Sequence, residues 1–358
     1  MDLVINVQKV GSMQNSDNQI SSSIERCDHT AMSCGAYIGQ DGGHRPTVLS
    51  VAGSDSIGGA GIQADIKACM ALGVYTMTAI TAVTAQNTVG VRSYINVGSE
   101  AVCAQLEAVF DDVRPDAVKI GMIPDGPTAV AVAEVLARRH VGPVVLDPVA
   151  VATSGDRLSD DSAAAEIVRR LFPMATVVTP NIPEARMLTG MDIATQSDME
   201  AAARAIIHRY GCRAVLLKGG HLVPDLSIRA ADKEQGTKLS TSTYTAGPEE
   251  ERAVDILVQA VDTPARVFNG PVVHTPNTHG TGCTLSSAIA AYLSRGYALE
   301  DAVARAKAWL SDALRVGAEC HFGHGHGPAL LIWNSQIEVK GPKVPKDTKV
   351  HKESHFLQ

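Results

Sequence analysis

The feature that most constrains the fold is a regular alternation, from residue 46 onward, of short β-branched runs with longer amphipathic stretches. This alternation is typical of parallel βαβ units, whose strands are buried on both faces and are therefore apolar almost throughout. Six such runs predict buried strands, at residues 47–53, 77–85, 116–122, 143–149, 175–180 and 213–218. The chain is expected to fold as an α/β domain with a mostly parallel central sheet.

Two of the intervening stretches have clear helix signatures. From Ser99, apolar residues including Val102, Leu106 and Val109 recur at helical spacing and form one face. Another helix is predicted to begin at Ser197 and Glu200, which have capping-box spacing. In open sheets covered by such helices, ligands bind at the carboxyl ends of the strands, so functional residues are expected there.

The domain boundaries follow from changes in pattern. Residues 1–45 lack periodicity and predict a disordered extension; a transit peptide is the alternative, but acidic residues outnumber basic ones there, against the usual composition. Residues 46–335 predict one doubly wound domain, in which 222–275 form a polar, variable insertion followed by a β-hairpin or flap. Residues 336–358 predict a disordered tail.

Composition excludes several function classes. A net charge of -7 gives no electrostatic reason to expect a nucleic acid or an anionic membrane as partner. No apolar run approaches the roughly 20 residues that a bilayer span needs. The seven cysteines are scattered without CxxC spacing, which indicates reduced thiols. We therefore expect a cytoplasmic protein. A small-molecule substrate and a homo-oligomeric assembly are further expectations that composition does not establish.

The glycine-rich loop after the first predicted strand resembles a dinucleotide fingerprint at Gly59, Gly61 and Ala64. That interpretation fails because residues 75–98 contain no acidic residue to hold a ribose. A P-loop motif is also missing from the sequence. Asp65 follows this loop, and two interpretations of its carboxylate stay open: interaction with the helix dipole, or hydrogen bonding to a ligand amine.

A second glycine turn, NTHGTGCT at residues 277–284, leads directly into an apolar helix. Gly280 and Gly282 allow close backbone approach, and free amides at a positive helix end suit a phosphoryl group. Cys283 lies at that helix start, where thiol pKa values are expected to fall. Three interpretations of Cys283 stay open: an inert buried thiol, a nucleophile paired with His279, or a base for phosphoryl transfer. The neighbouring glycines favour the base.

Charged residues lie at the carboxyl ends of three other predicted strands. Asp147 and Glu184 form a sparse acidic pair of the kind that suits Mg²⁺, although either is equally explained as a cap or turn residue. Lys218 precedes two glycines and either reaches a phosphate or is solvated. The histidines in residues 323–328 lack the partners of a metal motif.

Seven sequence motifs, taken together and in this order, indicate a known family: AGSDSIGGAGIQAD, TAVTAQNTVGV, KIGM, LDPV, TPNIPEA, KGGH and NTHGTGCTLSSAIA. Over residues 46–330 they closely resemble the hydroxymethylpyrimidine/phosphomethylpyrimidine kinases of thiamine biosynthesis, in the ribokinase-like superfamily. The resemblance implies a three-layer αβα fold without a separate lid domain. It also implies that ATP and Mg²⁺ are used to phosphorylate 4-amino-5-hydroxymethyl-2-methylpyrimidine and then its monophosphate.

The resemblance assigns roles to individual residues. Cys283 would be catalytic, at the place where the superfamily usually has an aspartate base, and Asp147 and Glu184 would place the metal. The substrate pocket would be formed by Gly53, Asp65, Gln86 and Met122. The ATP phosphates would be held by Lys218, Asn277, Thr278, Gly280, Thr281 and Gly282.

Three alternatives stay open. A pyridoxal kinase is the nearest, and Gln86 with Met122 is the feature that favours the pyrimidine. A non-catalytic ligand-binding protein would be expected to lack Cys283, the glycines or the carboxylates, and all are present. A Cys-dependent acyl transferase would form a covalent adduct with a substrate ester.

Overall fold

The computed structural model describes residues 44–139, 141–149, 158–220 and 252–331, and these form one compact unit. Its centre is a sheet in the order β3-β2-β1-β4-β5-β6-β7-β8-β9. The strands are β1 (Thr47–Asp55), β2 (Tyr75–Gln86), β3 (Val91–Asn96), β4 (Ala117–Ile120), β5 (Val144–Leu146), β6 (Val177–Val178), β7 (Val215–Lys218), β8 (Arg252–Val258) and β9 (Arg266–Pro271). All six predicted strands form, and they pair in parallel from β2 to β7.

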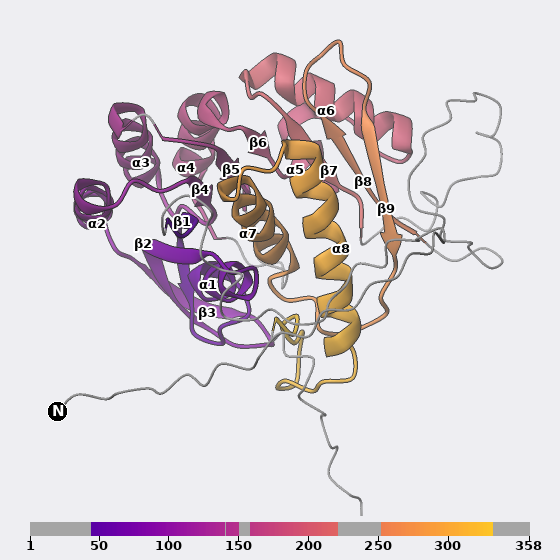
Figure 1. The fold of residues 1–358 in the computed structure, drawn as a ribbon, viewed down its shortest axis with the longest axis horizontal. Coiled ribbons are helices and arrows are strands. Elements are labelled where there is room, and N and C mark those ends of the chain that lie inside the picture. The colour runs from indigo at the N-terminus through magenta and orange to yellow at the C-terminus, as the bar shows by residue number, and fades with distance from the viewer. Residues whose placement is uncertain (1–43, 140, 150–157, 221–251, 332–358) are drawn as a thin grey trace, which may run out of the picture. The chain divides into compact units, whose positions relative to one another are not determined.

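Helices cover both faces of this sheet (Figure 1). They are α1 (Gly61–Ala71), α2 (Ser99–Asp112), α3 (Gly126–Arg139), α4 (Asp161–Glu166), α5 (Ile182–Thr189), α6 (Gln196–Tyr210), α7 (Thr281–Ser294) and α8 (Leu299–Gly317), with short π and 3₁₀ turns at Ile167–Leu171 and Phe172–Met174. Helices α1, α7 and α8 pack against one another on one face, and α2 to α6 supply the apolar residues on the other. The predicted three-layer αβα fold is confirmed.

Alternation along the strands explains why two cores form. In β4, Val118 and Ile120 face the core under α2 and α3, whereas Ala117 faces the core under α7. Successive side chains of a strand point to opposite faces, so a strand apolar at every position needs helices on both sides. Lys119 is the exception in this strand, and it is completely buried.

The edges of the sheet differ from the expectation. The strand β3 was not predicted; it pairs antiparallel with β2 and is largely exposed, so it lacks the continuous apolar run that marks the central strands. The hairpin or flap expected in the later part of residues 222–275 forms as β8 and β9, which extend the sheet in antiparallel fashion beyond β7. Residues 1–43 of the predicted extension, residues 222–251 of the insertion and the whole predicted tail (336–358) lie outside the described residues.

One helix start also differs. The capping box of α6 uses Thr195 and Asp198, two residues before the predicted pair Ser197 and Glu200. Both pairs have the required spacing, and Thr195 has the extended backbone that an N-cap needs. The predicted helix from Ser99 is confirmed as α2.

The order of the strands in the sheet indicates where a ligand would bind. From β1 the chain adds β2 on one side and later crosses to β4 on the other, so β1 and β4 flank a point where the strand order reverses. Ligands of open α/β sheets bind outside the carboxyl ends of the strands at such a point. Within the described ranges, no helix has the length and apolar character to cross a bilayer.

Candidate active site

A cavity of about 580 Å³ lies at this carboxyl edge, between the strand ends and the start of α7. It extends toward β9 and the side of α8. The structure brings most of the predicted site residues together in its lining: Gly53, Gln86, Met122, Asp147, Glu184, Lys218, Thr278, Gly280, Thr281, Gly282 and Cys283.

The glycine turn and the first glycine loop are in direct contact. Gly280 has a φ of +74°, and a Cβ built there would lie 1.8 Å from the carbonyl oxygen of Gly59. Only glycine fits this position, since both the conformation and the space exclude a side chain. The turn thereby leads into α7 with the amides of its first residues at the cavity, as an anion site requires.

A cation and a carboxylate lie beside the same turn. Lys218 Nζ donates to Asp147 Oδ1 at 2.8 Å, and Asp147 also accepts from Thr179 Oγ1 at 3.0 Å. A Cβ built on Gly282 would lie 3.3 Å from Lys218 Nζ and 3.4 Å from Asp147 Oδ2. Lys218 is therefore held in the site by an ion pair rather than freely solvated.

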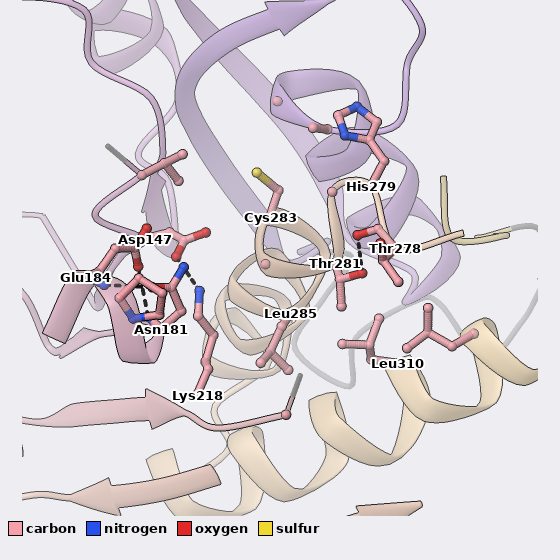
Figure 2. A pocket seen from close by; sticks show the side chains of 18 of the residues that line it. Asp147, Asn181, Glu184, Lys218, Thr278, His279, Thr281, Cys283, Leu285 and Leu310 are labelled. Atoms are coloured by element: carbon pink, nitrogen blue, oxygen red, sulfur yellow. Dashed lines mark hydrogen bonds and ion pairs between the residues drawn. The ribbon is translucent and has the colours of Figure 1, made fainter. Parts of the chain in front are cut away.

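Glu184 caps a helix, which is one of the two roles that its sequence position suggested. It completes a capping box at the start of α5, where Asn181 N–H donates to Glu184 Oε2 at 2.8 Å. It also lines the cavity near Asp147 and Lys218 (Figure 2). Burial raises the pKa of Glu184 to about 7; Lys218 opposes this rise and the like charge of Asp147 adds to it.

This acidic pair could hold a hard cation. Among the described residues, no three His, Cys, Asp or Glu side chains gather as a metal-binding group. A buried carboxylate whose pKa is raised in part by a neighbouring carboxylate suits a divalent ion that draws its other ligands from phosphates and water. Asp147 and Glu184 thus fit a Mg²⁺ ion that is bound together with a nucleotide. They do not form a site that would surround the ion with protein ligands alone.

Cys283 points into the cavity between Asp147 and His279 in the view of Figure 2. Its pKa differs from the expectation for a helix start. Burial raises the pKa of the Cys283 thiol above its ordinary value, although Lys119 and a hydrogen bond from the Gly61 amide oppose the rise. The predicted fall is wrong because removal of the thiol from water outweighs the favourable groups around it.

Two predicted ligand residues do not line the cavity. Asp65 is completely buried and its oxygens accept hydrogen bonds from Lys119, Ser50 and Ser287. Both sequence interpretations of Asp65 are therefore corrected: it lies beyond the first turn of α1, and its acceptor capacity is used inside the protein.

Asn277 is the second correction. Its side-chain amide donates to the carbonyl oxygens of Gly317 at 2.8 Å and Cys320 at 2.7 Å, and the residue is 2% exposed. Asn277 therefore anchors the glycine turn to the end of α8. The prediction that it touches ATP phosphates is not supported by this position.

Sequence reasoning missed a polar cluster around the first loop. Asp55 Oδ2 accepts hydrogen bonds from the amides of Gly59 and Ala60, and it lies 2.9 Å from His279 Nε2. His279 Nε2 in turn lies 2.9 Å from Gln86 Nε2. The hydrogen bonds lower the pKa of Asp55 despite its burial. The cluster joins both glycine segments to Gln86. The position of Asp55 at the end of a strand was the only feature of the sequence that could have predicted this cluster.

The far end of the cavity was also missed. It is lined by Leu285, Leu310 and Leu314, together with a buried ion pair in which Lys307 Nζ lies 2.5 Å from Asp255 Oδ2. These residues come from α7, α8 and β8, so neither a shared motif nor sequence spacing connects them. The cavity thus has a polar end at the sheet edge and an apolar end beside α8.

Fold and site together define a ribokinase-like small-molecule kinase. A family model described as phosphomethylpyrimidine kinase matches residues 55–330. The chain belongs to this family.

Individual relatives agree with that assignment. A hydroxymethylpyrimidine/phosphomethylpyrimidine kinase of Rhizobium meliloti is 45% identical over 281 residues, which is 78% of this chain and 94% of that protein. The thiamine biosynthesis bifunctional protein of Geobacter sulfurreducens is 45% identical over 284 residues, and the chain spans 52% of its length.

Solved structures show the same architecture. The crystal structure of phosphomethylpyrimidine kinase from Clostridium difficile 630 has 37% identity and a TM-score of 0.60, covering 75% of this chain and all of that one. An ADP complex of Bacillus subtilis pyridoxal kinase has 31% identity and a TM-score of 0.65, covering 79% of this chain and 97% of that one.

Proposed function

We propose that this kinase transfers the γ-phosphoryl group of ATP to the hydroxymethyl oxygen of 4-amino-5-hydroxymethyl-2-methylpyrimidine, and then phosphorylates the resulting monophosphate. The observation that carries the proposal is one continuous cavity that reaches from Gly53, Gln86 and Met122 to an anion-binding helix start. Gly53 and Met122 pack together in its wall, since a Cβ on Gly53 would lie 2.8 Å from Met122 Sδ. Gln86 lines the same cavity, with its side-chain amide nitrogen 2.9 Å from His279 Nε2, and the proposal has this polar pair recognise the pyrimidine ring.

The remaining roles follow the cavity outward. The amides from Gly280 to Cys283 and the Lys218 ammonium hold the transferring phosphoryl group, which needs positioning and charge more than covalent chemistry. Mg²⁺ neutralises phosphate charge when it is bound, and Asp147 and Glu184 hold it. The apolar end beside Leu310 takes the nucleotide base.

Cys283 is proposed as the group that accepts the hydroxyl proton. Because burial raises its pKa, the thiol is mainly protonated in the free enzyme at neutral pH. It therefore works from a small thiolate population, or it acts late in the transfer when the hydroxyl proton has already become acidic. Either route depends on nearby positive charge.

Pyridoxal kinase activity is the second candidate, favoured by the likeness to the Bacillus subtilis enzyme. Turnover of hydroxymethylpyrimidine and of pyridoxine with MgATP, measured side by side, separates the two. We expect kcat/KM for the pyrimidine to exceed that for pyridoxine by at least about tenfold, or about 1.4 kcal/mol. A higher value for pyridoxine would overturn the proposed substrate.

The setting of this activity is also proposed. The five cysteines in the described ranges are free thiols, which supports a reducing compartment such as the cytoplasm. A homo-oligomer stays a prediction, and sedimentation of the purified chain measures it.

A further inference from the structure

Lys119 is a buried charge that the proposed reaction does not use. It lies in the centre of the sheet, in β4, with a completely buried side chain. Its ammonium lies 2.9 Å from both oxygens of Asp65, which is also completely buried. A buried ion pair is costly to desolvate, and an apolar pair of similar volume is often as stable. The pair therefore calls for a reason besides stability.

The position of Asp65 connects the pair to the catalytic thiol. Asp65 follows Gly61 by four residues in α1, and Ser287 follows Cys283 by four residues in α7. Residues four apart lie on one helix face, and their side chains tilt toward the amino end of the helix. Ser287 Oγ donates to Asp65 Oδ1 at 2.6 Å, and this hydrogen bond connects α7 to α1. The charged pair therefore lies one helical turn below Cys283.

The Lys119 side chain extends toward the same edge of the sheet. A Cβ built on Gly121, two residues farther along, would lie 2.8 Å from Lys119 Nζ. The glycine thus leaves the space that the ammonium occupies. Ser50, which is paired with Lys119 in the register of β1 and β4, donates to Asp65 Oδ2 at 2.6 Å and fixes the carboxylate from the other side.

Four charged groups from four elements act electrostatically on Cys283, and His279 lies on one side of it in Figure 2. Lys119 of β4 favours its thiolate, whereas Asp65 of α1 and Asp147 after β5 oppose it. Lys218 of β7 is the second cation within electrostatic range of the thiol. Of the two cations, only Lys119 is completely buried and does not line the cavity, so a bound ligand cannot contact it.

We propose that Lys119 is a positioning residue for catalysis: held by Asp65, its ammonium places a fixed positive charge beneath Cys283 and makes the thiolate accessible during proton transfer. The proposal rests on the proposed role of Cys283 as proton acceptor. Asp65 sets the strength of the effect, since it partly neutralises the lysine.

The test uses two substitutions with opposite expected signs. The rate at which iodoacetamide alkylates Cys283 is measured from pH 7 to pH 10.5 by mass spectrometry of the peptide that carries it. Lys119→Met should raise the pH midpoint of alkylation, and the rate at pH 8 falls about tenfold for each unit of rise. Asp65→Asn should lower the midpoint, because it leaves the lysine without its counter-charge.

Val118→Ala is the control, since this neighbour in β4 is equally buried but faces the other core. It should lower the melting temperature without moving the midpoint. Midpoints that stay unchanged, or that move in the same direction in both charge variants, overturn the proposal. If Lys119→Met does not fold, Asp65→Asn decides alone: a lowered midpoint supports the proposal, and an unchanged or raised one overturns it.

Alkylation needs no turnover, so this result is independent of the reaction. If Cys283→Ala keeps full activity while the two midpoints move as expected, the role of the thiol in phosphoryl transfer fails and the electrostatic effect of Lys119 stands. If instead Cys283→Ala abolishes activity and the midpoints do not move, Lys119 is only structural.

Discussion

Cys283 is half-buried among charges of both signs, and its chemistry depends on their balance. The sequence was sufficient to single out this thiol, because it stands at a helix start that follows a glycine turn suited to an anion. It could not predict the direction of the pKa, which depends on how far the folded chain removes the sulfur from water. Asp65 and Asn277 show the same limit: their place beside a motif was clear, but the hydrogen bonds that occupy them come from distant residues.

Removal of the thiol tests its role. Cys283→Ala should lower kcat by at least about 100-fold, the usual lower range for loss of a proton acceptor, because the hydroxyl oxygen then attacks without help. Nucleotide affinity, measured by titration calorimetry, should stay within about twofold.

Cys103→Ala is the matched control for this variant, since Cys103 lies in α2 outside the cavity and should tolerate the change with unaltered kcat. Turnover of Cys283→Ala at the rate of the unmodified enzyme would remove the thiol from the mechanism.

Glu184 predicts a pH dependence of stability. Its folded pKa of about 7 lies above the ordinary value of 4.5, so between these values the folded state binds more protons than the unfolded state. The free energy of unfolding must then fall as pH rises through this window, and this contribution levels off above pH 7. Melting temperatures of the ligand-free protein and of Glu184→Gln, measured from pH 4.5 to 8, should diverge in favour of the variant.

The exposed Glu319→Gln is the control for this measurement and should give a curve parallel to that of the unmodified protein. Parallel curves for Glu184→Gln as well would mean that burial does not raise the pKa of Glu184.

At the scale of elements, two glycine segments and two helix starts form the site. The central strands and α2 were predictable because burial on both faces leaves an unbroken apolar run. The edge strand β3 was not, since four of its six residues are exposed, the other two are only partly buried, and its pairing depends on β2. The contact between the loop at Gly59 and the turn at Gly280 joins segments more than 200 residues apart, and no local pattern encodes it.

That contact gives a prediction at this scale. Gly280→Ala places a methyl group 1.8 Å from the Gly59 carbonyl oxygen, so the turn must move. It should destabilise the protein by about 1–3 kcal/mol and lower kcat by at least about tenfold, since displaced amides no longer match the phosphoryl oxygens. Urea unfolding and steady-state kinetics measure the two effects.

Gly296→Ala is a close control because its φ is +84° but nothing lies within 4 Å of the added methyl group. It should cost about 1 kcal/mol from the left-handed backbone alone and leave kcat unchanged. Equal kcat values for the two variants would show that the contact between the loops does not matter for catalysis.

For the whole molecule, the order of the strands decides where chemistry can occur. The reversal at β1 and β4 opens the sheet edge, α7 aims its amino end at that opening, and α8 closes the apolar end of the cavity. The fold class and the edge that carries the site were predictable from strand and helix order alone. The far end of the cavity was not, because Asp255, Lys307 and Leu310 meet only through the packing of β8 against α8.

The most direct test of the central claim is mass spectrometry of the products formed from hydroxymethylpyrimidine and MgATP by the purified chain. The proposed function predicts a monophosphate that appears first and a diphosphate that accumulates as the monophosphate declines, with both products lost when ATP is omitted. Recovery of unmodified hydroxymethylpyrimidine, under conditions in which the same preparation phosphorylates pyridoxine, would contradict it.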